Sequence, residues 1–564
     1  MFVKIKRGDT MNALICSINS KYIHSSLAAW CLKAGIEKYS PLTKCDVFEC
    51  TINESIQDIK SKLDLKTYDV IGFCTYIWNV DYVLKLCEHI KRTKKAKIVL
   101  GGPEVGYAVE KYLNKDYIDF IITGEGEKTF ARLCEGEDFE KIEGLSYKKE
   151  NKIIQNAGNQ AGEILSPYST EYYAQLDGRI AYIETSRGCP FKCGFCLSGR
   201  CNDVRFLDID EAKKRILQLA NSGTQTVKFV DRTFNADKNR AKELFKFIIE
   251  NYSINIPSNV CFHFEIEATL IDEETILILK NAPVGAIQLE IGIQSFNKET
   301  LISINRNRNL TMMIENIKSL ISLGNMHIHI DLIAGLPYEN MLSFERSFNS
   351  AYALQANMLQ LGFLKILHGS DLEEKAEKLG LIYSKNPPYQ IIETQWITAE
   401  EMQKLNTCEG IFDKIYNSGR FYLTCKYIVE CIGNPFKIFM DFSGHLAKNG
   451  KIKDRTLDEL TFEIYNYFSK KEKINENKLR DALVMDRLST NNTGAIPDFL
   501  KIHSPKIKRV LHMLETNPEK RRQKGIKRAI SLLSSQNVAV YVDYINQNPV
   551  TKRYELYQID IDNM

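Results

Sequence analysis

The stretch Ile183–Cys201, IETSRGCPFKCGFCLSGRC, contains four of the fifteen cysteines of this 564-residue chain. Cys189, Cys193 and Cys196 are spaced Cys-x3-Cys-x2-Cys and follow a strand-like run, AYIETS. Three thiolates from one short loop can hold three corners of a [4Fe-4S] cluster and leave the fourth iron open to another ligand. If Cys201 were a fourth ligand, the site would be structural zinc or a complete cluster. The flanking strand, unlike a zinc ribbon, favours the open cluster.

Strand-like runs alternate with helical patterns around and after these cysteines. The runs span residues 181–186, 226–231, 260–268, 286–295, 326–337 and 358–367. They predict a partial (β/α)6 barrel over residues 179–375, with its chemistry at the carboxyl ends of the strands. The candidate residues at these positions are Asp231, Glu265, Glu267, Glu290, Gln294, Ser295 and Asp331, with Gly335 in the segment AGLP. For Glu265 and Glu267, an ion pair with Arg306 or Arg308 is the alternative.

Residues 11–145 have a different repeat, in which five short apolar runs are separated by amphipathic helical patterns. The runs are NALICSI, KCDVFEC, YDVIGFCTY, KIVLGG and DFIITG. This alternation predicts a parallel, doubly wound sheet of the flavodoxin or Rossmann type. Ligands of such sheets lie beyond the carboxyl ends of the strands, where the sequence places Gly101, Gly102, Gly124 and Gly126. These glycines permit close approach of a ligand to the backbone, although ordinary turn formation also explains them.

The cysteine spacing, with the aromatic Phe195 directly before Cys196, resembles the signature of radical S-adenosylmethionine (SAM) enzymes. The resemblance implies that the open iron binds SAM and that the reduced cluster cleaves it to a 5'-deoxyadenosyl radical. It also implies roles for three segments: Asp231 near the methionine amino group, Glu290 and Gln294 near the ribose or carboxylate with Ser295 beside them, and Gly335 along the adenine.

The runs VLGGPEVG and ITGEGEKTF resemble the cobalamin-binding domain that precedes the barrel in some radical SAM enzymes. The resemblance covers residues 11–145 and implies that Gly101, Gly102, Gly124 and Gly126 line a cobalamin site. The Asp-x-His-x-x-Gly motif that supplies a histidine to cobalt in many cobalamin proteins is absent. His24 is the histidine best placed to substitute for it, and a capping or core-edge role is the alternative.

The remaining residues predict a linker at 146–178 and an α-rich accessory domain at 376–564. Two strand-like runs near the end, NVAVYVDYI and RYELYQID, are expected to pair as a small sheet. A basic segment over residues 501–529 contains ten Lys or Arg and is interpreted as a solvated helix face in preference to an RNA contact.

The composition restricts where the protein works and what it binds. The net charge of +4 is too small to indicate nucleic acid or a membrane surface. No apolar run approaches the roughly 18 residues of a membrane span, and the N-terminus lacks the pattern of a secretory signal. We therefore expect a cytoplasmic protein with reduced cysteines and no membrane or nucleic-acid partner.

The resulting hypothesis is a cobalamin-dependent radical SAM enzyme that transfers a methyl group to an unknown substrate, or cyclises or rearranges it. An external electron donor such as flavodoxin or ferredoxin is expected. One alternative is a methylthiotransferase-like enzyme that acts on tRNA or protein, with a second iron-sulfur cluster held by Cys16, Cys50 and Cys74. Another alternative is a non-catalytic iron-sulfur or zinc protein.

Overall fold

The computed structural model describes residues 11–158, 162–200, 203–450 and 455–561, and these form two compact units. The first unit comprises Met1–Ile271, Ile304–Arg306 and Leu364–Ile392. The second comprises Asp272–Ser303, Asn307–Phe363 and Glu393–Met564. The N-terminal sheet and the cysteine segment therefore belong to the same unit.

The N-terminal sheet has seven strands in the order β2-β1-β3-β4-β5-β6-β7. The first five pair in parallel. Their bounds are β1 Asn12–Asn19, β2 Lys44–Thr51, β3 Val70–Cys74, β4 Lys97–Gly101 and β5 Phe120–Ile122. The strand order 2-1-3-4-5 confirms the predicted flavodoxin-type sheet.

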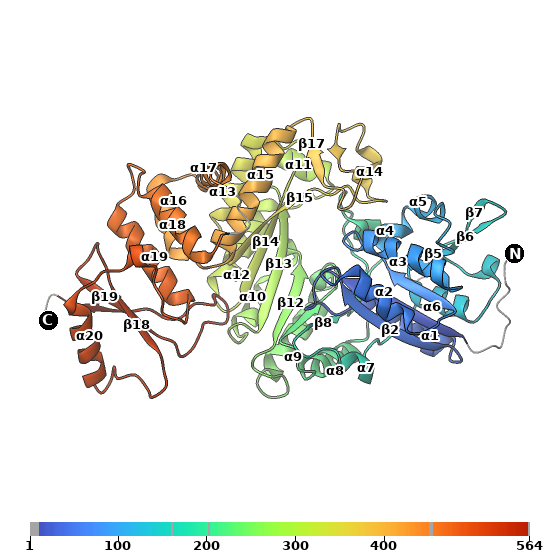
Figure 1. Ribbon diagram of the computed structural model, residues 1–564, viewed down its shortest axis with the longest axis horizontal. Coiled ribbons are helices and arrows are strands. Elements are labelled where there is room, and N and C mark those ends of the chain that lie inside the picture. The colour runs from blue at the N-terminus through green and yellow to red at the C-terminus, as the bar shows by residue number, and fades with distance from the viewer. Residues whose placement is uncertain (1–10, 159–161, 201–202, 451–454, 562–564) are drawn as a thin grey trace. The chain divides into compact units, whose positions relative to one another are not determined.

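Both faces of this sheet are covered by helices (Figure 1). Alternate residues of β1 enter two separate apolar clusters, with Leu14 and Cys16 in one and Ala13 and Ile15 in the other. The first cluster includes α2 (Ile56–Asp64), α3 (Val80–Thr93), α4 (Pro103–Gly106) and α5 (Val109–Leu113), and the second includes α1 (Leu27–Tyr39) and α6 (Gly126–Cys134). Burial on both faces explains why the strands are continuously apolar.

The sheet continues past residue 145 into a hairpin of β6 (Leu145–Lys149) and β7 (Lys152–Gln155). Both strands run antiparallel to their neighbours. The hairpin occupies the start of the segment that the sequence assigns to a linker.

The second sheet has six strands in the order β15-β14-β13-β12-β11-β8. The first unit contributes β8 (Ile180–Ile183), β11 (Thr226–Phe229) and β12 (Cys261–Ile266), and the second contributes β13 (Ile287–Gln294), β14 (His327–Ala334) and β15 (Met358–Phe363). Strands pair in parallel within each unit. Six strands in this order confirm the predicted partial barrel.

The helices that connect these strands all begin at an Asp or Asn whose side chain accepts a hydrogen bond from a backbone N–H of the first turn. Such caps satisfy donors that the helix itself leaves unpaired. The helices and their caps are α8 (Ile209–Ala220, Asp208), α9 (Lys238–Asn251, Asp237), α10 (Glu273–Lys280, Asp272), α12 (Leu310–Ser322, Asn309) and α13 (Met341–Tyr352, Asn340).

The C-terminal region is α-rich, as predicted. Its helices of eight or more residues are α15 (Ala399–Phe412), α16 (Tyr422–Ile432), α17 (Pro435–Lys448), α18 (Leu457–Phe468), α19 (Glu476–Thr490) and α20 (Pro505–Thr516). The closing runs form β19 (Val538–Asp543) and β20 (Tyr557–Asp560), which pair antiparallel. A third strand, β18 (Arg528–Leu532), extends this sheet from the end of the basic segment. Among the described residues, no helix is both long and apolar enough to cross a membrane.

Candidate functional site

The cysteine loop, residues 188–200, follows β8 and the short strand β9 (Ser186–Arg187). Gly188 has φ +108°, and a Cβ at that position would lie 2.3 Å from the backbone oxygen of Asp203. Only glycine fits this turn into the loop. Cys193 is buried, whereas Cys189 and Cys196 are half-buried, and Cys201 lies outside the described residues.

The thiols of the loop have polar neighbours from the same unit. Cys189 Sγ lies 3.4 Å from Thr233 Oγ1, and Arg306 Nη1 donates to Cys193 Sγ at 3.4 Å. Arg306 also pairs with Glu267 at 3.4 Å, as the sequence allowed. A guanidinium donor suits a sulfur ligand that becomes anionic on metal binding.

The residue types of the loop fit an iron-sulfur cluster. Three thiolates can each bind one iron of a [4Fe-4S] cube and leave the fourth iron without a protein ligand. Cys189, Cys193 and Cys196 are the candidate ligands.

Asp231 follows β11 and anchors the residues that lead into the cysteine loop. Its two carboxylate oxygens accept hydrogen bonds from Thr185 N, Thr185 Oγ1 and Ser186 Oγ at 2.8, 2.6 and 2.7 Å. Burial raises the pKa of Asp231, and these hydrogen bonds oppose the rise. The structure thus shows Asp231 positioning the backbone before Arg187; its predicted contact with the methionine amino group remains a prediction.

Arg187 connects the cysteine loop to the N-terminal sheet. It pairs with Glu125 at 2.9 Å, Glu127 at 2.9 Å and Glu184 at 2.7 Å. Burial lowers the pKa of Arg187, but the three carboxylates outweigh burial and raise it overall. Glu125 and Glu127 belong to the TGEGE run after β5, so a loop of the predicted cobalamin domain is held two residues from Cys189. Sequence patterns alone did not indicate this role of Arg187, although the acidic run TGEGE was a sign that a basic partner was needed.

The four predicted glycines lie at or just beyond the carboxyl ends of the neighbouring strands β4 and β5. Gly102 has φ +116°, and a Cβ there would lie 2.4 Å from Thr75 O. Gly124 has φ +78°. Gly101 has no such restriction, because its nearest neighbour would be Ile122 at 3.9 Å, and Gly126 faces Leu32 at 2.9 Å. Backbone geometry and close packing therefore require glycine at position 102. They do not require it at position 101, where a ligand could be the reason for glycine.

This edge of the N-terminal sheet also exposes large apolar side chains. Tyr22 follows β1, Trp78 follows β3 and Tyr107 follows β4, with exposed fractions of 73%, 46% and 48%. The ring of Trp78 stacks on Tyr76 with centroids 4.4 Å apart. Exposed apolar side chains that gather at one ligand-binding edge fit a large, partly apolar cofactor such as cobalamin.

His24 and the core cysteines have other partners. His24 Nδ1 lies 2.7 Å from the Tyr182 hydroxyl, and burial lowers the pKa of His24. Cys16 and Cys50 pack in one apolar cluster of the sheet, while Cys74 packs in the cluster on the opposite face. Three thiols divided between two faces cannot converge on one auxiliary cluster, so this arrangement disfavours the methylthiotransferase alternative.

Glu265 lies on β12 of the first unit, 3.8 Å from Lys228. The second unit contains the predicted residues from Glu290 onward, and two of them lie together at the end of β13. Gln294 has φ +73°, and its buried Oε1 accepts no hydrogen bond from the described residues. Ser295 Oγ donates to Glu339 Oε1 at 2.7 Å, and Ser347 Oγ donates to the same atom at 2.8 Å. Burial raises the pKa of Glu339 to about 7, although both hydroxyl donors lower it.

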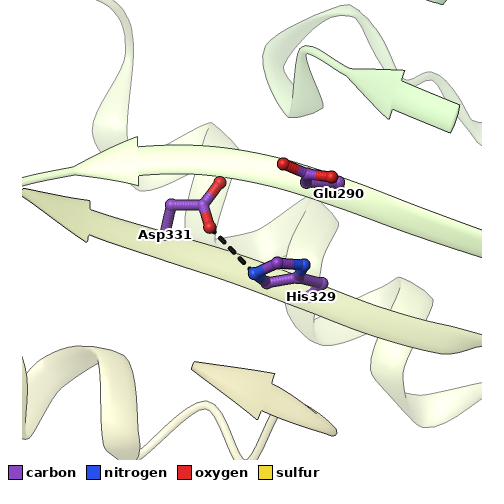
Figure 2. Close-up of side chains that lie close together, drawn as sticks. All are labelled: Glu290, His329 and Asp331. Atoms are coloured by element: carbon purple, nitrogen blue, oxygen red, sulfur yellow. Dashed lines mark ion pairs between the residues drawn. The ribbon is translucent and has the colours of Figure 1, made fainter. Parts of the chain in front are cut away.

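The buried Gln294 Oε1 is an acceptor suited to an N–H donor such as SAM carries. An unsatisfied buried acceptor is costly, and an N–H group of a ligand would satisfy it. Gly335, with φ +83°, follows the adjacent strand β14 at the same edge. Glu290 lies further back on β13, where it faces His329 and Asp331 (Figure 2).

Sequence comparisons agree with this arrangement. The profile of the B12 binding domain matches residues 14–134, and that of the Radical SAM superfamily matches residues 183–351. The chain belongs to the cobalamin-binding-domain subgroup of the radical SAM superfamily. A third profile, described as a protein of unknown function (DUF4080), matches residues 377–553 of this radical SAM protein.

Relatives of this radical SAM protein differ in named activity. It is 25% identical over 323 residues to 2-(S-pantetheinyl)-carbapenam-3-carboxylate methyltransferase from Streptantibioticus cattleyicolor. The matched region covers 50% of this chain and 44% of that protein. It is 27% identical over 245 residues to the putative methylthiotransferase MJ0865 from Methanocaldococcus jannaschii. That match covers 41% of this chain and 52% of MJ0865. The chain thus spans about half the length of these relatives.

Among solved structures, the cobalamin-dependent SAM radical enzyme OxsB, with aqua-cobalamin and SAM bound, matches with a TM-score of 0.57. The identity is 14%, over 91% of this chain and 81% of OxsB, so the likeness concerns the fold. The radical SAM and B12-binding domains identify the cofactors as a [4Fe-4S] cluster, SAM and cobalamin.

Proposed function

We propose that this radical SAM protein is a methyltransferase-type enzyme that uses cobalamin to methylate an unactivated centre of an unidentified substrate. When bound, the three cofactors supply a 5'-deoxyadenosyl radical for hydrogen abstraction and a cobalt-carried methyl group. An external flavodoxin or ferredoxin is the proposed electron donor.

The observation that carries the proposal is the contact of Arg187 with Glu125 and Glu127. It joins the loop after β5 of the cobalamin-type domain to the loop of cluster ligands inside one compact unit. Hydrogen abstraction and methyl delivery must act on the same substrate, and rigid positioning of two reactive centres lowers the entropic cost of such a sequence. A protein that only stored a cluster would not need this link.

The chain's own residues would perform binding and positioning. Cys189, Cys193 and Cys196 would supply the thiolates, with Arg306 donating to Cys193. Asp231 would fix the entry to the loop through Thr185 and Ser186.

Product analysis tests this proposal. The anaerobically reconstituted protein, loaded with cobalamin and reduced in the presence of SAM, should form both 5'-deoxyadenosine and S-adenosylhomocysteine. The second product reports transfer of the methyl group of SAM, which a cyclase or isomerase does not require. Formation of 5'-deoxyadenosine alone would contradict the methyltransferase assignment while preserving the radical one, and formation of neither would contradict both.

A further inference from the structure

A cluster of one imidazole and two carboxylates lies on the β13–β14 pair of the second unit. His329 and Asp331 are two residues apart on β14, so they project from the same face of the strand. Glu290 of β13 is the register partner of His329. The two strands are parallel neighbours, which brings Glu290 to the same face. The backbone alone therefore places the three side chains together.

The side chains converge as this register requires (Figure 2). His329 Nε2 lies 2.9 Å from Asp331 Oδ1. The ligand atoms of Glu290, His329 and Asp331 all lie within 4.8 Å of one another. Among the described residues, no other set of three His, Cys, Asp or Glu side chains is this compact.

The cluster is withdrawn from solvent. His329 is 5% exposed, and Glu290 and Asp331 are half-buried. The intervening residues Ile291 and Ile330 are fully buried on the opposite face of the strands. Low exposure to solvent strengthens the electrostatic attraction between carboxylates and a cation bound beside them.

A further oxygen donor lies on the neighbouring strand. Gln360 is the register partner of Asp331 on β15, and this register places its amide on the same face of the sheet. Gln360 is therefore a candidate for an additional oxygen ligand.

We propose that Glu290, His329 and Asp331 form a binding site for a divalent first-row transition-metal ion. One imidazole nitrogen with two carboxylate oxygens is a donor set for Mn²⁺, Fe²⁺ or Zn²⁺ rather than for the oxygen-preferring Ca²⁺. Three protein ligands leave coordination positions open for water or for an anionic group. None of its three ligands belongs to the cysteine loop, and it gives Glu290 a role other than the SAM contact that the sequence predicts.

The test uses Mn²⁺ itself and does not depend on turnover. The reconstituted protein, desalted to remove free metal, is titrated with MnCl₂ while electron paramagnetic resonance measures the free aqueous ion. We expect one binding equivalent per chain. Asp331→Asn, Glu290→Gln and His329→Gln should each weaken binding at least about tenfold, the smallest effect expected for loss of a metal ligand. Zn²⁺ should displace bound Mn²⁺, as its place in the affinity order requires, whereas equimolar Ca²⁺ should not.

A matched control lies on the same strand. His327 projects from the same face one repeat before His329 but is not part of the cluster. His327→Gln should retain Mn²⁺ affinity and the iron content of the wild-type protein. If the wild-type protein and the three near-isosteric variants gave the same Mn²⁺ binding curve, the proposal would be overturned. The three side chains would then form only a hydrogen-bonded triad. Loss of binding only in His327→Gln would also overturn it.

Discussion

Arg187 of β9, directly before the cysteine loop, and Glu127 in the first turn of α6 form an ion pair at 2.9 Å, although they are separated by sixty residues of sequence. Glu125 and Glu184 complete the set of carboxylates around the same guanidinium. The position of the cluster ligands is thereby coupled to the loop that follows β5. Replacement of Arg187 is therefore the most direct test of this coupling.

Arg187→Gln should destabilise the first unit by about 2 kcal/mol, because it leaves three carboxylates close together without their cation. This value is below the usual cost of breaking a fully buried pair because the Arg187 side chain is 19% exposed. Urea unfolding and the cobalamin content of the reconstituted protein measure the effect. Arg200→Gln, which removes an exposed pair with Glu374, should cost less than about 1 kcal/mol. Equal effects of the two changes would contradict the special role of Arg187.

Cys193→Ala should abolish the brown chromophore and all SAM cleavage, because a cube held at two corners is not retained. Iron quantitation and formation of 5'-deoxyadenosine check this outcome. Cys45→Ala, at the start of β2, should leave both unchanged, and so should Cys201→Ala. A bleached Cys201→Ala protein would indicate four protein ligands and refute the open iron.

Gly102→Ala should disrupt the N-terminal sheet, since its Cβ would meet Thr75 O at 2.4 Å in a backbone region that alanine rarely adopts. We expect a loss of at least about 2 kcal/mol in the free energy of unfolding. Gly101→Ala should keep this stability, because its Cβ would lie 3.9 Å from Ile122. If Gly101→Ala also binds cobalamin with wild-type affinity, then Gly101 does not line the cofactor site.

Glu339 should make the stability of the second unit depend on pH. Its pKa is about 7 in the folded protein against an ordinary 4.5, so the folded state holds the proton more tightly. The stabilisation is present below pH 4.5 and disappears as the pH rises through 7. Between pH 5.5 and 8 this amounts to about 2 kcal/mol.

Urea unfolding at these two pH values measures the Glu339 effect. Trp396 packs 4.6 Å from Tyr338, next to Glu339, and becomes the sole reporter when Trp30 and Trp78 are replaced by Phe. Glu339→Gln in that background should flatten the difference between the two pH values. An unchanged difference would assign the pH dependence to other groups.

The strands were predictable because their signals are local. The alternation around β1–β5 and the repeated runs of the partial barrel each lie within about ten residues, and the cysteine spacing lies within one loop. The β6–β7 hairpin was missed because its turn residues, Glu150 and Asn151, adopt positive φ without the glycine that usually marks such a turn. The β18 strand was missed because it follows a long basic run that has no strand pattern.

Contacts between distant residues account for the rest of the site. The acidic run TGEGE and Arg187 are visible in the sequence, but their pairing requires the tertiary fold. The polar alternation in the run HIHID places His329 and Asp331 on one face of a strand, yet the register with β13 is needed to add Glu290. The alternation of residue types predicts which face of a strand a side chain occupies. The register between neighbouring strands determines which side chains lie next to one another on that face.

Quantitation of iron, sulfide, zinc and cobalamin in the anaerobically reconstituted and desalted protein tests the central claim most directly. The account predicts about four irons with matching sulfide, and about one cobalamin, per chain. Stoichiometric zinc in place of iron, or about eight irons without cobalamin, would contradict it.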